Sequence, residues 1–345
     1  MSATPEIARE EFASYVGRLD RKGRTLVFHD SDADGVTAGV VLEAALGRMG
    51  FVSLSRIAPG RERDAWSVEN RTLIASHAPD SLFLLDLGSR GEPLIDRGEV
   101  CLIDHHHPDG TPPGALLISG FTWRPIPNTS LMVYDLCSPI VSVDDLDWIA
   151  AVGVLSDLGD KAPFPLLERV KKRYRMAHLK EITTLVNAAR RVSDCRPEIA
   201  ARALMTHGSP AALIASESSD VEWMRNAREE VKAEMAIAKK AAPKFSGNVA
   251  LVRVRSTCQV HPVIAQIWRT RLPKYIVIVA NDGFLPGRVN FSARSAEGVN
   301  LLEFLRGIDL GEGEGSYARG HEQATGGSLP VERWNLLLEK LGFIP

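Results

Sequence analysis

The chain has 345 residues, of which 45% are apolar and 24% charged, as in an ordinary globular protein with room for two domains. No apolar run is long enough to cross a membrane, and the polar, acidic N-terminus does not match a secretory signal. The four cysteines show no Cys-x-x-Cys spacing, which argues against a zinc knuckle and predicts reduced thiols in a cytoplasmic protein. The formal net charge of −2 does not by itself indicate a nucleic-acid-binding protein.

The first half of the chain alternates β-rich and helical segments. Residues 24–30, 81–88 and 99–107 form nearly continuous apolar runs that end in polar residues, as the central strands of a parallel sheet do. A helix is predicted at 37–50, where the run ends in a glycine. Strands and helices in this order predict a doubly wound α/β domain.

The middle of the chain has a helical pattern. Residues 144–160 predict a helix that Asp144 or Asp145 would cap. Further helical segments follow from 163 to 243, and the last of them has the largely polar surface expected of a helix that bridges two domains.

β-rich runs return after the helical region, at 248–254, 274–282 and 287–295, followed by a glycine-rich stretch and a final helix. The pattern predicts two α/β domains joined by a helical linker, with the active site in the cleft between them. The predicted parts are a doubly wound parallel-sheet domain (1–195), the linker (196–244) and a smaller mixed-sheet domain (245–345).

Acidic residues and histidines follow the predicted strands of the first domain. The carboxyl ends of parallel strands face one ligand crevice, so these side chains are expected to converge there. A further aspartate is expected to join them from the helix at 144–160. The candidate residues are Asp30, Asp32, Asp34, Asp86, Asp104, His105, His106, His107 and Asp157.

Each of these elements also has a structural interpretation. The Asp-x-Asp-x-Asp-Gly run resembles the start of an EF-hand loop, but Val41 stands where that loop needs its glutamate. The three histidines could form a solvated turn, Asp86 a helix cap and Asp157 a surface acid. Five or six carboxylates in one crevice, however, repel by several kcal/mol unless cations neutralise them.

Oxygen ligands with one or two imidazoles favour Mn²⁺ or Mg²⁺ over a zinc ion held by thiolates. The ligands suffice for two ions that share a carboxylate, and such a pair can hold the attacking and leaving oxygens of a phosphoryl group. The residues therefore predict metal-assisted hydrolysis of a phosphoester.

Two groups of basic residues are a second feature. One lies between Arg169 and Arg191, and the other between Arg253 and Arg294. Each group can be a solvated surface or a field that attracts a polyanion.

Four motifs resemble those of the DHH phosphoesterase superfamily. IDHHHP (103–108) resembles its Asp-His-His signature, and HDSDADG (29–35), FLLDLGS (83–89) and GVLSDLGD (153–160) resemble its other three metal motifs, in the same order. The superfamily includes RecJ-like exonucleases, nanoRNases, cyclic-dinucleotide phosphodiesterases and family-II pyrophosphatases.

The resemblance continues in the last third of the chain, so that it covers roughly residues 24 to 330. NFSARS (290–295) and ARGHEQATGGSLP (318–330) look like the substrate-binding strands and glycine-rich loop of the C-terminal domain that accompanies many members. This argues against a pyrophosphatase, whose second domain is different.

The resemblance implies roles for individual residues. His106 matches the histidine that contacts the scissile phosphate, Asp104 the residue that holds the histidine pair, and Asp86 the bridging ligand. Asp30 takes the first ligand position by spacing, with His29 as the alternative, and His107 is expected outside the ligand set. The implied metal ligands are Asp30, Asp32, Asp34, Asp86, His105 and Asp157, and the implied substrate contacts are Ser292, Arg294, Arg319, Gly320 and His321.

Together these features predict a phosphodiesterase that uses two Mn²⁺ ions, with Mg²⁺ as an alternative. It is expected to act on single-stranded DNA or RNA or short oligonucleotides, to release 5′-mononucleotides, and to have no membrane partner. A small-nucleotide phosphoesterase, acting on a cyclic dinucleotide or phosphoadenosine phosphate, is the alternative of the same chemistry. A non-catalytic nucleic-acid-binding relative is the alternative from another class. The motifs specify no oligomeric state.

Overall fold

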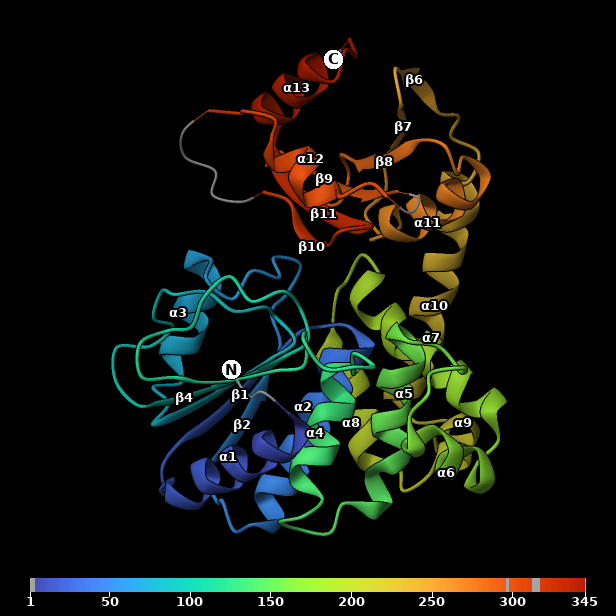
Figure 1. The fold of residues 1–345 in the computed structure, drawn as a ribbon. Helices are drawn as coiled ribbons and strands as arrows, with labels where there is room; N and C mark the ends of the chain where they lie inside the picture. The colour runs from blue at the N-terminus through green and yellow to red at the C-terminus, as the bar shows by residue number, and fades with distance from the viewer. Residues whose placement is uncertain (1–3, 296–297, 312–316, 345) are drawn as a thin grey trace. The chain divides into compact units, whose positions relative to one another are not determined.

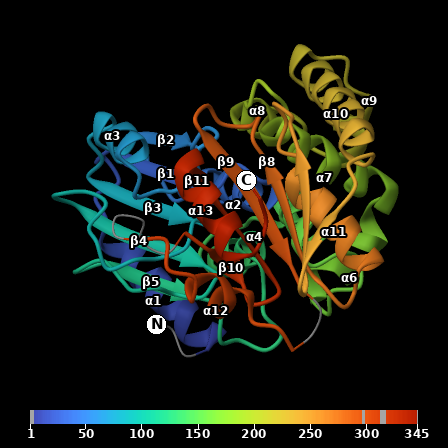
Figure 2. The same ribbon diagram turned by 90° about the horizontal axis from the view of Figure 1, so that it is seen from above.

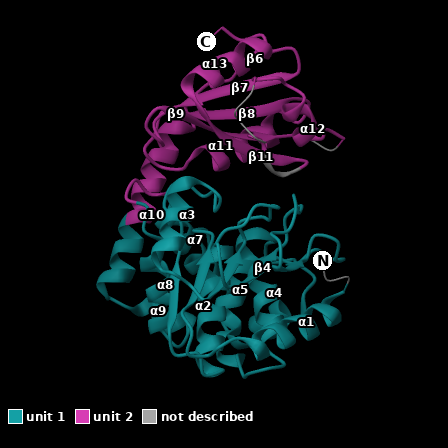
Figure 3. Ribbon diagram, turned by 90° about the vertical axis from the view of Figure 1, so that its left-hand side faces the viewer, with its two compact units in different colours: residues 1–190, 195–226 teal, residues 191–194, 227–345 magenta. Residues whose placement is uncertain are grey.

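The computed structural model describes residues 4–295, 298–311 and 317–344 (Figure 1). The chain divides into two compact units (Figure 3). Unit 1 comprises Met1–Arg190 and Cys195–Asn226, and unit 2 comprises Arg191–Asp194 and Ala227–Pro345.

Unit 1 is built on a five-stranded parallel sheet with strand order β2-β1-β3-β4-β5 (Figure 2), so the predicted doubly wound α/β domain is confirmed. The strand order reverses at β1, which lies between β2 and β3. The strands are β1 (Thr25–His29), β2 (Leu54–Ile57), β3 (Ser81–Leu85), β4 (Glu99–Asp104) and β5 (Leu116–Ser119).

Helices cover both faces of this sheet. Successive strand residues point to opposite faces, and the residues on each face are apolar. Val27 and Phe83 pack in the core with α1 (Pro5–Arg18), α2 (Ala33–Arg48) and α4 (Thr129–Cys137). Leu26 and Phe28 pack in a second core with Ile74 of α3 (Val68–Ser76). A strand buried on both faces must be apolar throughout, which explains the continuous runs in the sequence.

The remaining helices of unit 1 extend the first core. They are α5 (Asp147–Asp157), α6 (Pro165–Arg173), α7 (Met176–Arg191), α8 (Pro197–Thr206), α9 (Pro210–Ala215) and α10 (Ser219–Ala238), with a 3-10 turn, η1 (Asp144–Leu146), before α5. None of the described helices combines the length and apolar character that crossing a bilayer requires.

Two local predictions at helix starts were inaccurate. Asp144 and Asp145 do not cap α5, because they lie in the 3-10 turn, and the Asp145 carboxylate instead pairs with Arg48 at 2.7 Å. Helix α2 begins four residues earlier than predicted, because Asp32 is its N-cap and accepts hydrogen bonds from the backbone N–H groups of Asp34 and Gly35.

Unit 2 contains the predicted mixed sheet, with strand order β10-β11-β9-β8-β7-β6. β7 and β8 are parallel and the other neighbours are antiparallel. Helix α11 (His261–Arg271) packs in one apolar core of this unit, and α12 (Leu301–Arg306) and α13 (Val331–Lys340) pack in another. The strands are β6 (Lys244–Ser246), β7 (Val249–Val254), β8 (Ile276–Asn281), β9 (Arg288–Arg294), β10 (Arg319–His321) and β11 (Ala324–Pro330).

The predicted linker, 196–244, corresponds to α8, α9 and α10. Ile199 and Leu204 of α8 are buried in the core of unit 1, and the two units divide inside α10, between Asn226 and Ala227. The short segment 191–194 belongs to unit 2, where the N–H of Gln259 donates to the carbonyl of Arg191 at 2.8 Å.

Candidate metal centre

The carboxyl ends of β1 and β3 carry the first group of candidate ligands. Asp30 follows β1 and Asp86 follows β3, at the point where the strand order of the sheet reverses. Ligands of open parallel sheets bind at such reversal points. Asp30, Asp32 and Asp86 each direct a carboxylate oxygen into one cluster, in which the oxygens lie within 4.8 Å of one another.

Asp34, in the first turn of α2, is fully buried and is held by the start of α4. The side chain of Asn128 and the backbone N–H of Ser130 donate to one of its oxygens at 2.7 Å, and the backbone N–H of Thr129 donates to the other at 2.9 Å. A helix N-terminus offers N–H groups that favour an anion, so α4 fixes the orientation of this carboxylate.

Asp86 is positioned by an unusual backbone conformation and by a hydroxyl. Its φ of +64° lies in the left-handed region, where Asp is one of the more tolerant residues. The hydroxyl of Thr129 donates to Asp86 Oδ1 at 2.9 Å. Both features turn a buried carboxylate toward the cluster instead of into the sheet.

His105, directly after β4, connects the carboxylates. Its Nε2 lies 3.3 Å from Asp86, 3.7 Å from Asp34 and 3.8 Å from Asp157, which is the last residue of α5. Two further groups with the spacing of metal ligands result, Asp34–His105–Asp157 and Asp86–His105–His106. The structure thus brings every predicted metal ligand into overlapping triads that share Asp86 and His105.

Asp104 and His106 form a pair beside this cluster. Asp104 Oδ1 accepts from the backbone N–H of His106 at 2.5 Å and lies 2.8 Å from its ring Nδ1, while Oδ2 accepts from the N–H of Gly88 at 2.7 Å. Although burial opposes protonation of the imidazole, the Asp104 carboxylate raises the pKa of His106 to about 10. The same pair holds the pKa of Asp104 well below its usual range, in spite of its burial.

The carboxylates of the cluster repel one another, and this repulsion indicates whether a cation would fit among them. Burial, and then repulsion from other carboxylates, raise the pKa values of Asp34 and Asp86 well above the usual range and that of Asp157 to about 7. Burial, and then His106, lower the pKa of His105 to about 4, so its ring is neutral at pH 7, the form that ligates metals. Carboxylate oxygens with a neutral imidazole suit Mn²⁺ or Mg²⁺, so the donor set fits the predicted ions.

Two arginines that the sequence interpretation missed also reach the cluster. Arg63, in the loop between β2 and α3, donates to both oxygens of Asp30 and lies 3.3 Å from Asp32. Arg190, in α7, lies 3.6 Å from the same Asp32 oxygen. Arg63 lies in a loop without a motif, and Arg190 belongs to the basic group between Arg169 and Arg191, but no sequence signal placed either residue beside the carboxylates.

His29 has a different environment from Asp30. Its Nδ1 lies 2.6 Å from the carbonyl oxygen of Asp30, its Nε2 lies 3.4 Å from Arg56, and its ring packs closely against Gly39 of α2. The ring therefore belongs to the packing between β1 and α2. Asp30 is the member of this pair that enters the carboxylate cluster.

His107 lies outside the cluster. Its side chain is 57% exposed, its Nδ1 lies 3.5 Å from Asp109, and its ring packs edge-on against Phe121.

The predicted substrate contacts lie on three neighbouring strands of unit 2. Gly326 of β11 pairs with both Ser292 of β9 and Arg319 of β10, and Ala324 of β11 pairs with both Arg294 and His321. Burial, together with the nearby Arg269, lowers the pKa of Arg294. The side chains of Arg319, Gly320 and His321 lie outside the described part of the chain, so these positions are placed by their backbone alone.

Comparison with solved structures identifies the fold. The crystal structure of exonuclease RecJ bound to manganese matches 98% of this chain and 95% of its own, with a TM-score of 0.65 and 19% identity. RecJ from Thermus thermophilus in complex with Mn²⁺ matches 98% of this chain and 55% of its own, with a TM-score of 0.69 and 19% identity. The DHH domain of a member of a ribosomal protein family matches 99% of this chain and 90% of its own, with a TM-score of 0.67 and 16% identity.

The chain has the fold that these RecJ and DHH-domain structures share. No family model and no curated protein matches the sequence. At identities of 16–19% the structural likeness concerns the fold. The chemistry of this chain therefore rests on its own residues.

Proposed function

We propose that this chain is a divalent-metal-dependent phosphoesterase that hydrolyses phosphodiester bonds in single-stranded nucleic acid or short oligonucleotides. The observation that carries the proposal is the set of overlapping ligand triads that share Asp86 and His105. Buried acids this close together are costly without cations, and a purely structural role does not require them.

The residues present would hold two ions, with Asp86 between them. When bound, the divalent ions would supply positive charge for a phosphate and would lower the pKa of a water molecule. Asp30 and Asp32 would serve one ion, and Asp34, His105 and Asp157 the other. Both Mn²⁺ and Mg²⁺ are bound in structures of RecJ with a similar fold, which supports either metal for this chain.

His106 would act on the phosphate. Asp104 accepts from its backbone N–H and lies within hydrogen-bond distance of Nδ1, which fixes the ring and stabilises its protonated form. A proton on Nε2 would then be donated to a phosphate oxygen or to the leaving group. We propose that Asp104 is a positioning residue and that His106 contacts the substrate.

In unit 2, we propose that Ser292 and Arg294 contact a phosphate or nucleotide next to the scissile bond. Arginine binds phosphate with two parallel hydrogen bonds. Arg319, Gly320 and His321, on the strand beyond β11, are proposed to contribute to the same contact.

The test is a cleavage assay with Mn²⁺ or Mg²⁺, with a chelator as control, on an end-labelled single strand, a dinucleotide and a cyclic dinucleotide. Metal-dependent release of 5′-mononucleotides from the single strand is expected. Cleavage of the cyclic dinucleotide or the dinucleotide alone would assign the small-nucleotide activity instead, and no cleavage of any substrate would refute the enzyme.

A matched pair of variants tests the site itself. Asp157→Asn removes a proposed ligand, and we expect it to abolish turnover. Asp160→Asn changes a partly exposed acid three residues later that pairs with Lys180 at 2.5 Å, and we expect it to have no effect on turnover. Equal activity of the two variants would show that Asp157 is not a ligand.

A further inference from the structure

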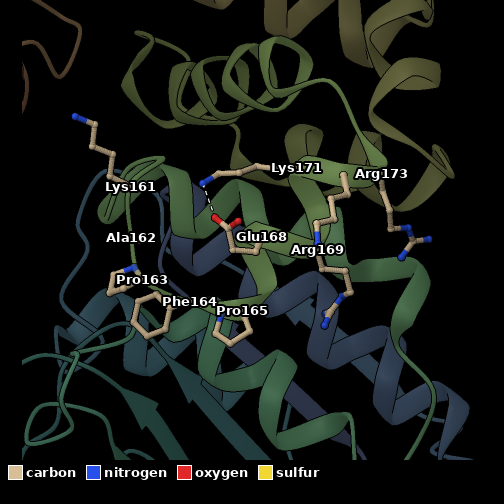
Figure 4. Close-up of a pocket in the computed structure, with 10 residues that line it drawn as sticks. Lys161, Ala162, Pro163, Phe164, Pro165, Glu168, Arg169, Lys171 and Arg173 are labelled. Atoms are coloured by element: carbon tan, nitrogen blue, oxygen red, sulfur yellow. Dashed lines mark hydrogen bonds and ion pairs between the residues drawn. The ribbon is translucent and has the colours of Figure 1, made fainter.

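A basic groove lies in unit 1 between the loop at 161–165 and helix α6 (Figure 4). It encloses about 840 Å³, and none of the proposed metal ligands lines it. The loop begins four residues after Asp157, the proposed ligand at the end of α5. Five of the lining residues are cations: Lys161, Arg169, Lys171, Lys172 and Arg173.

Nearby acids neutralise part of this charge. Lys171 pairs with Glu168 at 2.9 Å, and Arg173 lies 2.6 Å and Arg169 3.8 Å from the carboxylate of Asp147, which is fully buried. Counted over the lining residues and Asp147, three positive charges remain, and Asp160 near Lys161 and Asp135 near Arg169 offset part of them. An excess of this size on one face attracts a polyanion and is weakened by salt.

Lys161 and Lys172 carry this excess most directly. Both are exposed, and among the residues that the structure describes no carboxylate lies within ion-pair distance of either, although Asp160 attracts Lys161 and Glu168 attracts Lys172 at longer range. A lysine that neutralises a phosphate of a bound strand releases a counterion condensed on that strand, which favours binding at low salt.

Apolar groups lie beside the charges. Phe164 is half-buried at the start of α6, and Figure 4 shows its ring next to Pro163 and Pro165. The two prolines restrict the backbone of this loop. Single-stranded nucleic acids are bound by this combination, in which cations contact phosphates and an aromatic ring stacks on a base.

We propose that this groove binds the backbone and bases of single-stranded nucleic acid at nucleotides beyond the one that is cleaved. The proposal rests on the proposed function and extends it from the cleaved bond to the nucleotides beyond it. An acidic peptide would also satisfy the positive charges, but the phenylalanine between two prolines favours the flat faces of bases.

The experiment measures binding of a fluorescent oligothymidylate about 20 nucleotides long, in chelator, over a range of salt concentrations. The double variant Lys161→Glu/Lys172→Glu is expected to weaken binding roughly tenfold or more. It is also expected to reduce the slope of log K against log salt by about 1.4, because each of the two lost phosphate contacts contributes about 0.7. Lys22→Glu/Arg97→Glu makes the same change of net charge at exposed positions elsewhere in unit 1, and we expect it to alter neither quantity.

A third variant separates stacking from charge. Phe164→Leu keeps an apolar side chain in the core but removes the aromatic ring, and we expect several-fold weaker binding with an unchanged salt slope. Unchanged Mn²⁺ affinity in the two groove variants would show that unit 1 remains folded. Equal effects of the groove pair and the control pair would overturn the proposal.

A polyglutamate peptide of similar charge is the second ligand. If it binds the wild-type groove as tightly as the oligonucleotide does, the groove is a protein-docking surface and the proposal is wrong. Cleavage of a dinucleotide by the wild-type protein is measured separately. If the protein cleaves the dinucleotide but the groove variants bind the oligonucleotide as the wild type does, only the groove proposal is refuted. If the protein cleaves none of the substrates, the proposed function is refuted.

Discussion

Replacing Asp86 with Asn is expected to stabilise the metal-free protein and, at the same time, to abolish its stabilisation by metal. Asp86 is 2% exposed, and its carboxylate lies within 4.8 Å of ligand oxygens of Asp30 and Asp32. Asn keeps an acceptor for the Thr129 hydroxyl and tolerates the φ of +64° at least as well as Asp does. The substitution therefore removes a charge with little change of shape.

The magnitude follows from the spacing of the charges. At an effective dielectric constant of about 20, two unit charges 4.8 Å apart repel by roughly 3.5 kcal/mol. Arg63, which pairs with Asp30 and Asp32, and the His106 cation offset much of this repulsion. We therefore expect the free energy of unfolding to rise by about 1 to 3 kcal/mol in the metal-free variant.

Urea unfolding in chelator measures this gain, and the melting temperature with and without Mn²⁺ measures the metal effect. Wild-type protein should gain about 2.7 kcal/mol when the free metal concentration is about 100 times the dissociation constant. Asp96→Asn, an exposed acid in the same unit, is the control and should change neither quantity. A metal-free Asp86→Asn protein that is less stable than the wild type would refute the reasoning.

The gain also depends on pH. Burial, and then repulsion from Asp32, raise the pKa of Asp86, so this carboxyl takes up a proton in the folded protein at a pH where the unfolded chain is still ionised. The wild type therefore recovers stability as the pH falls, while the Asn variant has no charge to lose at this position. The difference between the two proteins should be largest above the raised pKa of Asp86 and should shrink as the pH falls below it toward the ordinary range of a carboxyl.

Three further substitutions test the packing and the charges around the site. Gly153→Ala should lower the free energy of unfolding by about 1 to 3 kcal/mol, because a Cβ there would lie 2.4 Å from a side-chain oxygen of α2. Gly17→Ala is the control, because a Cβ there meets open space, and it should raise the free energy of unfolding by about 0.5 to 1 kcal/mol in the same urea assay. Arg63→Gln should strengthen Mn²⁺ binding roughly tenfold in a calorimetric titration, because the metal no longer competes with the guanidinium; unchanged affinity would contradict this. His29→Ala should lower the free energy of unfolding by about 2 kcal/mol or more but leave the number of bound Mn²⁺ ions unchanged. Asp30→Asn should reduce the number of bound Mn²⁺ ions. The reverse result would make His29 the ligand.

The central strands of the first sheet could be predicted because burial on both faces requires apolar runs, such as 81–88. The acidic positions could be predicted because parallel strands end at one edge, so residues far apart in sequence, such as Asp30 and Asp86, had to converge there. The short strands β2 and β5 were missed. Each has only four residues, which is too few for a periodic pattern to emerge.

The groups that hold the candidate ligands could not be predicted. Asn128 is recognisable as an N-cap before an apolar segment, but its contact with Asp34, 94 positions away, exists only after the chain has folded. Arg63 comes from a loop without periodicity, and a local motif does not report which carboxylate such a side chain will reach. Sequence patterns thus predicted the residues that carry the charges, and tertiary structure determined which partners orient them.

Helices α8, α9 and the first half of α10 complete the core of unit 1. This order has a consequence for folding during synthesis on the ribosome. The candidate ligands in this unit have all been made once Asp157 is added, but Val221 and Met224, both 0% exposed in the same core, come much later. At about 5 to 20 residues per second, this interval lasts roughly 3 to 13 s. During that time the nascent chain carries its repelling acids without the helices that enclose the core. Metal capture is therefore expected to follow the emergence of α10 from the exit tunnel, and not that of the last ligand.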